Sequence, residues 1–125
     1  MSSAESGPLA PAELAVGART NRRTALVELR GELDLATVSK LADVLSDIEP
    51  GSAGPQHVVL DLRGLTFIDV PGLRELMTQS DFARTNRHNL AVVSGTPAIN
   101  RVLSLSGVDE HLVLVDHPDD LVPPV

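Results

Sequence analysis

Two aspartates stand where this sequence could most easily place chemistry. Asp34 follows Gly31-Glu32-Leu33, and Asp69 precedes Val70-Pro71-Gly72-Leu73. Each lies between a segment typical of a strand and one typical of a helix, so each is a natural cap for free helix N–H groups. Two nearby carboxylates could also serve as a general acid and base or hold a metal ion. Because no histidine or third carboxylate accompanies them in these loops, we expect capping and surface roles instead.

The remaining polar residues form no catalytic or metal-binding pattern. The chain has no cysteine, which excludes disulfides, thiolate catalysis and cysteine-bound zinc. Thr96 precedes Pro97 and is interpreted as a helix cap. The histidines lack the spacing of a ligand set, and we expect surface or strand-edge positions for His57, His88, His111 and His117. We therefore predict no enzyme activity, no metal and no cofactor.

Composition limits the class of protein further. The chain has 125 residues, enough for one core, and a net charge of -7. Nucleic-acid binders usually carry a basic face, whereas only Arg19, Arg22 and Arg23 cluster here, so we expect a protein partner and no nucleic acid. No apolar run approaches the roughly 20 residues of a membrane span, and the start of the chain does not resemble a signal peptide. We expect a cytoplasmic protein without membrane insertion.

The period of the apolar residues predicts the elements that position these side chains. Alternation predicts a strand over 25–33, after a weaker strand signal at Leu14 and Val16 and a turn over 20–23. Helical spacing follows Asp34, and helices also begin at Pro71 and Pro97, the last with Val102 facing inward and Gly107 as its C-terminal cap. Continuous apolar runs predict further strands over 57–62, 90–93 and 112–115, with a loop over 64–69.

This order, β-β-α-β-α-β-α-β, predicts an α/β fold. We expect a four- to five-stranded mixed, mostly parallel sheet with helices packed on it. Aromatic residues are almost absent, so the core must be built from Leu, Val, Ile and Ala. We assign residues 12–118 to the domain, 1–11 to a disordered lead-in and 119–125 to a short tail holding at most one turn of helix.

Three segments, taken together, resemble the STAS domain family, of the anti-sigma factor antagonist kind. They are Gly31–Asp34, Val58–Asp69 and Gly72–Leu76, followed downstream by Leu105–Val108. The middle segment is the most specific of them, and the order and spacing of all the segments strengthen the match. The resemblance extends from about Leu14 to Val115. It implies the STAS fold and a regulatory binding module.

In that family, the turn before the second helix usually reads Asp-Ser-Ser-Gly. The resemblance implies a partner, an anti-sigma factor that is also an ATP-binding serine kinase and phosphorylates the second serine. The unphosphorylated antagonist binds this partner and frees a sigma factor, and the added phosphate charge breaks the contact. The partner-binding residues implied here are Asp34, Asp69, Val70, Pro71, Gly72 and Leu73.

The phosphorylation switch itself is missing from this sequence. Val70 and Pro71 replace the two serines, and neither side chain has a hydroxyl to accept phosphate. Thr66, the nearest preceding hydroxyl, lies too far before the helix to substitute for it. We expect an antagonist that phosphorylation at residue 71 cannot inactivate. The alternative is a non-phosphorylatable STAS subunit of a transporter ATPase complex or a signalling scaffold, and a weak homodimer also stays open.

Overall fold

The computed structural model describes residues 13–51 and 54–121 of the chain. These residues form a five-stranded sheet in the spatial order β2-β3-β4-β5-β6. Its first two strands are antiparallel and every other neighbouring pair is parallel. The α/β fold, the mixed sheet and the order of strands and helices are therefore as predicted. The strands are β2 Leu14–Asn21, β3 Thr24–Leu33, β4 His57–Ile68, β5 Asn89–Val93 and β6 Leu114–Val115.

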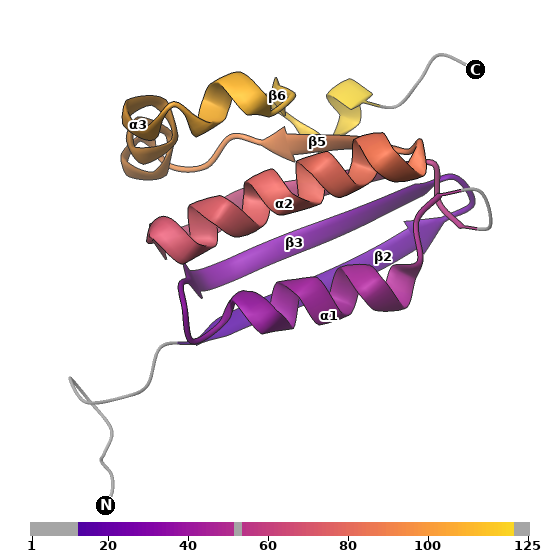
Figure 1. Cartoon of the computed structure of the whole chain (residues 1–125), viewed down its shortest axis with the longest axis horizontal. Coiled ribbons are helices and arrows are strands. Elements are labelled where there is room, and N and C mark those ends of the chain that lie inside the picture. Colours follow the sequence, from indigo (N-terminus) through magenta and orange to yellow (C-terminus); the bar gives the residue numbers. More distant parts are fainter. Residues whose placement is uncertain (1–12, 52–53, 122–125) are drawn as a thin grey trace, which may run out of the picture.

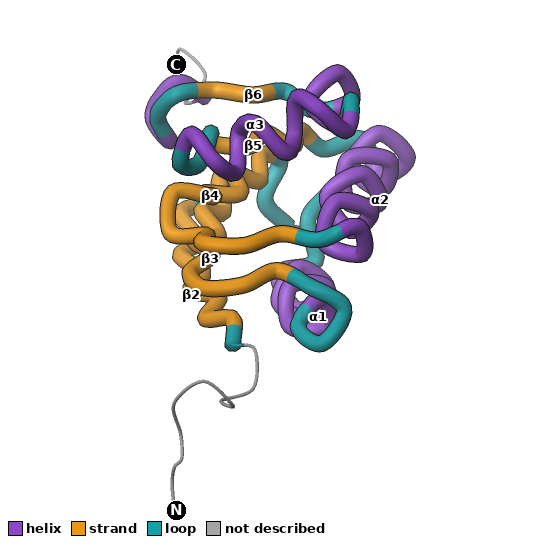
Figure 2. Tube along the Cα trace, turned by 90° about the vertical axis from the view of Figure 1, so that its left-hand side faces the viewer, coloured by secondary structure: helices purple, strands orange, loops and turns teal. Residues whose placement is uncertain are grey.

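Three α-helices and two short 3-10 helices complete the described part of the chain. They are α1 Val38–Ile48, α2 Val70–Asn86, α3 Pro97–Ser106, η2 Val108–His111 and η3 Pro118–Leu121. Helices α1 and α2 lie side by side on one face of the sheet (Figure 1), and the view turned by 90° separates this helical layer from the strands (Figure 2). The predicted lead-in, residues 1–11, lies outside the described residues, and the proposed domain limits stay predictions.

One aliphatic core joins the sheet to the helices. The inward face of β3 is fully buried at the alternating positions Ala25, Val27, Leu29 and Leu33, as its pattern predicted. Helices contribute Leu41, Leu45, Leu73, Leu76, Ile99 and Leu103 to the same cluster. Val102 was predicted to face inward but is exposed, because Ile99 and Leu103 already occupy the inward side of α3.

The predicted bounds of the first and last strands were wrong. Strand β2 continues to Asn21, which leaves only Arg22 and Arg23 in the hairpin turn, and Arg22 adopts a positive φ of 49° there. The last strand is confined to Leu114–Val115 instead of 112–115. The C-terminal cap predicted at Gly107 is confirmed by its φ of 80° and the bond from its N–H to the Ser104 carbonyl.

Strand β4 is longer than the sequence suggested. The apolar run ends at Leu62, and residues 64–69 were expected to form a loop. Instead, β4 continues to Ile68 and stays paired with β3 as far as Leu33↔Ile68, through two shifts of register. Its pairing with β5 stops at Asp61↔Val93. The second half of β4 therefore pairs with β3 alone. As a result, the turn that follows β4 lies beside the end of β3.

A buried carboxylate holds the chain where β4 changes register. Asp61 is 4% exposed, and its side chain accepts a bond of 2.7 Å from Arg63 Nη2 and one of 3.0 Å from the Arg63 backbone N–H. Burial alone would raise the pKa of Asp61, but the hydrogen bonds and charge of Arg63 outweigh it and hold that pKa below its usual value. Asp61 is thus ionised and internally paired, so its role is structural.

Candidate functional site

The carboxyl ends of β3 and β4 lie next to each other and send the chain into α1 and α2, at the left of Figure 1. The Asp69 backbone N–H donates to the Leu33 carbonyl at 3.3 Å, which joins the turn before α2 to the end of β3. The carboxyl ends of neighbouring parallel strands are a common place for binding sites in α/β folds.

Asp69 caps α2, as predicted, and also connects the two loops. It has extended backbone angles, and its Oδ1 accepts a hydrogen bond from the Gly72 N–H at 2.9 Å. Its other oxygen, Oδ2, accepts one from the Leu35 N–H at 3.2 Å, across a separation of 34 residues. One carboxylate therefore fixes the start of α2 against the loop between β3 and α1.

Asp34 does not cap α1, which corrects the sequence prediction. The helix begins at Val38, after a turn over residues 35–37, and its N-cap position is Thr37. The Asp34 Oδ1 atom accepts a hydrogen bond from the Ala36 N–H at 2.9 Å. The buried Thr37 hydroxyl donates to the Glu32 carbonyl at 2.7 Å and accepts from the Asp34 N–H at 2.9 Å, so this loop closes on itself.

Gly72 is needed because the first turn of α2 approaches β3 closely. A Cβ atom at this position would lie 2.4 Å from the Leu33 carbonyl oxygen and 2.8 Å from Ile68 Cγ1. Gly72 and Leu73 are both buried, whereas Asp34, Asp69 and Pro71 are half-buried. The six predicted binding residues are therefore brought together, but two of them form the interior support of the turn.

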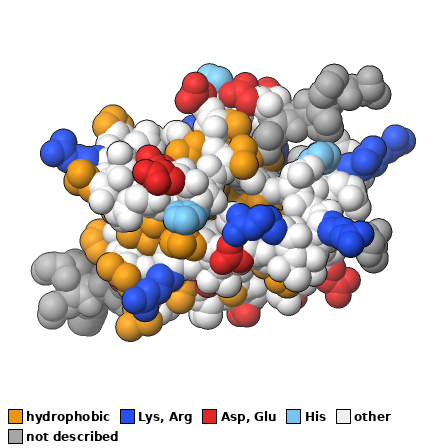
Figure 3. Space-filling model, turned by 45° about the horizontal axis from the view of Figure 1, so that its top comes forward, with side chains coloured by type: hydrophobic (Ala, Val, Ile, Leu, Met, Phe, Trp, Pro, Cys, Tyr) orange, Lys and Arg blue, Asp and Glu red, His pale blue; other side chains and the backbone are white. Residues whose placement is uncertain are grey.

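Three exposed apolar side chains accompany Asp69. Leu35 is 74% exposed, Val70 57% and Phe67 47%. The backbone of Leu35 bonds to Asp69, and the other two residues lie within two positions of it along the chain. In the space-filling view, hydrophobic side chains gather on the left-hand side of the molecule (Figure 3). Leu35 and Phe67 were not predicted as site residues, although Phe67 is one of only two Phe, Tyr or Trp residues in the chain.

The start of α2 has no hydroxyl. Val70 is its first residue and Pro71 its second, so the helix begins one residue earlier than expected. The exposed Thr66 side chain donates to the Gly31 carbonyl at 3.1 Å. At the neighbouring turn, Thr96 caps α3 as predicted, by accepting from the Ile99 N–H at 3.3 Å.

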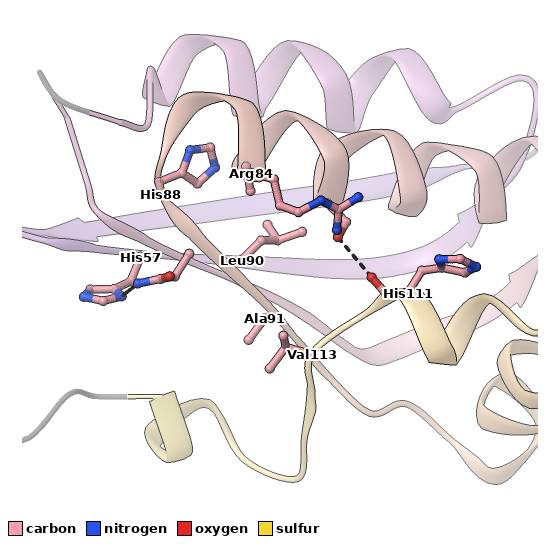
Figure 4. A pocket seen from close by; sticks show the side chains of 10 residues that line it. His57, Arg84, His88, Leu90, Ala91, His111 and Val113 are labelled. Atoms are coloured by element: carbon pink, nitrogen blue, oxygen red, sulfur yellow. Dashed lines mark hydrogen bonds between the residues drawn. The ribbon is translucent and has the colours of Figure 1, made fainter.

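A second region brings together histidines that are scattered in the sequence. His57, His88 and His111 line one cavity of about 370 Å³ between the second half of α2 and strand β5 (Figure 4). His88 is 7% exposed, so its predicted surface or strand-edge position was wrong, and burial lowers its pKa. Among residues 13–51 and 54–121, no group of three or more His, Asp or Glu side chains could hold a metal ion.

The structure is a small α/β domain in which the capped turn lies at the carboxyl ends of two neighbouring parallel strands. The chain belongs to the STAS domain family: the family model described as "Mlab, STAS domain" matches residues 16–116. None of the helices in the described residues has the length and apolar character needed to cross a membrane.

Relatives and solved structures give the family match more detail. The chain is 28% identical over 97 residues to an anti-sigma F factor antagonist of Paenibacillus polymyxa, covering 78% of this chain and 82% of that protein. Its fold is similar to an anti-sigma factor antagonist from Mycobacterium paratuberculosis, with a TM-score of 0.71, 23% identity and coverage of 86% and 90%. The murine anion transporter Slc26a9 contains a similar fold, with a TM-score of 0.72 and 16% identity, over 83% of this chain and 18% of the transporter.

Proposed function

We propose that this chain is an anti-sigma factor antagonist that its partner cannot inactivate at the turn before α2. In this proposal, it binds an ATP-binding anti-sigma factor of the serine-kinase type, and the bound sigma factor is released. It acts by binding and catalyses no reaction. Because sigma factors act on RNA polymerase, we also propose a cytoplasmic location for the protein. The names of the relatives support the antagonist role.

One observation carries the proposal. Asp69 keeps both of its bonds, to Gly72 and to Leu35, while the next two positions carry Val70 and Pro71 instead of hydroxyl residues. The turn has therefore kept an ordered shape without a phosphate acceptor. A helix N-terminus attracts anions, so a phosphate there would be held strongly and would change the charge of the edge. Because valine and proline cannot accept phosphate, this change of charge cannot occur at Val70 or Pro71.

The proposed contact residues follow from exposure. Leu35, Phe67 and Val70 would pack against an apolar patch of the partner, and Asp34, Asp69 and Pro71 would border them. A few side chains that become buried at the centre of a contact usually carry most of its binding energy. Gly72 and Leu73 would contribute by supporting the turn from inside, because both are buried.

Affinity capture from a lysate of the source organism, with identification by mass spectrometry, tests this function. We expect the unmodified chain to recover an ATP-binding anti-sigma factor, with or without added ATP. A Leu35→Ser variant should lose that protein, because Leu35 is exposed at the proposed contact. The matched control is Leu105→Ser, a change at a similarly exposed leucine on α3, which should retain it.

A different set of captured proteins would favour the second candidate, a STAS subunit of a transporter complex or signalling scaffold. The specific support for it is the similar fold within the Slc26a9 transporter. Recovery of transporter subunits, lost in Leu35→Ser, would assign the same edge to that role and contradict the antagonist function.

A further inference from the structure

The cavity beside α2 has a composition unlike the rest of this acidic chain. The chain carries 17 Asp and Glu against 10 Lys and Arg, yet the residues lining the cavity include Arg84 and three histidines and no carboxylate. Its volume of about 370 Å³ lies at the lower end of the range for small-molecule sites. The lining therefore favours a small ligand that is negatively charged.

Apolar side chains form much of the cavity wall. Leu90 and Ala91 come from β5, Ala83 from α2 and Val113 from the segment before β6. Val113 is exposed despite being large and apolar, and Leu90 is only half-buried. In the view of Figure 4, Leu90 lies between Arg84 on one side and Ala91 and Val113 on the other. A ligand with an apolar body would cover this surface and gain from its removal from water.

Arg84 is available to an anion. Its only ion pair among the described residues is with Asp81, one turn earlier on α2, and both side chains are largely exposed. Surface pairs of this kind contribute little, so a ligand carboxylate can replace Asp81 at small cost. The planar guanidinium also offers two parallel N–H groups to a carboxylate.

His88 also lines this cavity and carries a buried ring nitrogen without a hydrogen-bond partner among the described residues. The side chain is more than nine-tenths buried, and its Nδ1 atom has no hydrogen-bond partner among the described residues. A buried polar atom without a partner is costly, and such atoms in native structures call for an explanation. Burial lowers the pKa of His88, so its ring is neutral near pH 7 and can donate or accept one bond.

We propose that this cavity binds a small organic carboxylate, whose apolar body rests on Leu90 and Val113 and whose carboxylate pairs with Arg84. The site lies apart from the edge around Asp69. The first residue of β4, His57, lines the cavity, whereas the Asp69 turn follows the last residue of β4. The proposal is therefore independent of the proposed function.

Titration of the full chain with benzoate, followed by ¹H–¹⁵N NMR, tests this site. We expect saturable shifts of the Leu90 and Ala91 amides. Arg84→Gln should weaken binding about tenfold, because a charge-assisted pair is lost. Asp81→Asn should strengthen it about twofold, because Arg84 is freed from a weak pair. Arg101→Gln, at an exposed residue of α3, is the control and should leave the affinity unchanged.

Two comparison probes test the chemical class of the ligand. Benzyl alcohol has the same ring without the charge, and inorganic phosphate has charge without an apolar body. Both should bind more weakly than benzoate. The proposal is overturned if benzoate gives no saturable shifts, if Arg84→Gln binds it as well as the unmodified chain, or if either comparison probe binds as tightly. Since no anti-sigma factor is present, failure here leaves the antagonist function untouched.

Discussion

Two turns of this chain start a helix in the same manner but differ in what else they hold together. At Asp69 and at Thr96, a side-chain oxygen caps the helix and a proline lies in the first turn. Among the described residues, the Thr96 side chain bonds only to the Ile99 N–H, whereas Asp69 has a second side-chain oxygen that accepts from the Leu35 N–H in another loop. The capping side chain of the first turn therefore joins two loops, whereas the capping side chain of the second turn stays within its own loop.

The difference begins in the strands that precede the turns. Strand β4 continues beside β3 as far as Ile68, while β5 ends at Val93, level with Asp61. The longer strand delivers Asp69 to the end of β3, where another chain segment is within reach. The two turns share a capping side chain and a proline, but they differ in their contacts because the strands before them differ in length. The following substitutions test this difference.

Filling the space at the two glycines should give the largest contrast. Gly72→Ala places a Cβ atom 2.4 Å from the Leu33 carbonyl oxygen, so the backbone must move. We expect a loss of about 3 kcal/mol in the free energy of unfolding. At Gly95 the tightest contact would be 3.0 Å, to the Leu62 carbonyl oxygen, and Gly95→Ala should cost about 1 kcal/mol. Urea unfolding measures both, and equal losses would mean that the two turns are packed alike.

Removing the two caps should give a smaller contrast in the same direction. Asp69→Ala loses the bonds to Gly72 and Leu35 and should lower the free energy of unfolding by about 2 kcal/mol. Thr96→Ala loses one bond and should cost about 1 kcal/mol. Asp69→Asn keeps an acceptor for the Gly72 N–H, so its loss in the free energy of unfolding should fall between those of Asp69→Ala and Thr96→Ala. If it matched Asp69→Ala, the bond to Leu35 would account for the whole effect.

Acid should reveal the support that Asp61 gives to the extended part of β4. Arg63 holds the pKa of Asp61 below its usual value, so the ionised carboxylate stabilises the fold above about pH 4, and this contribution is lost as pH falls through the lowered pKa. Asp61→Asn should cost about 1 kcal/mol near pH 7 and progressively less below about pH 4. Thermal unfolding across this range measures the difference, and a constant gap would show that ionisation of Asp61 plays no part.

Local rules predicted the helix starts well. The caps at Asp69 and Thr96 and the buried alternation of β3 follow from residue types within a few positions. Asp34 misled the same rules, because the Thr37 hydroxyl joins Glu32 and Asp34 and the chain makes an additional turn before α1. That competition depends on three-dimensional closure of the loop, which residue types alone do not reveal.

Contacts between distant residues account for the other errors. The sequence Arg63-Gly64 after an apolar run is typical of a turn, but β3 keeps pairing with the chain beyond it. Nothing next to Leu35 in the sequence distinguishes it from other loop residues. Its place beside Asp69 depends on a hydrogen bond between residues 34 positions apart. Likewise, His88 follows Arg87, which caps the end of α2 in a left-handed conformation, and only the packing around it shows that the ring is buried.

We propose that the Asp69 turn binds a partner that cannot inactivate it by phosphorylation. The most direct test restores the hydroxyl with Pro71→Ser and uses Pro71→Ala as the control. Each protein is incubated with the captured anti-sigma factor and ATP, and phosphate incorporation and affinity are measured. We expect no effect of ATP on the unmodified chain or Pro71→Ala. Pro71→Ser should be phosphorylated and bind at least about tenfold more weakly. Phosphorylation of the unmodified chain with loss of binding, or unchanged binding of phosphorylated Pro71→Ser, would contradict the account.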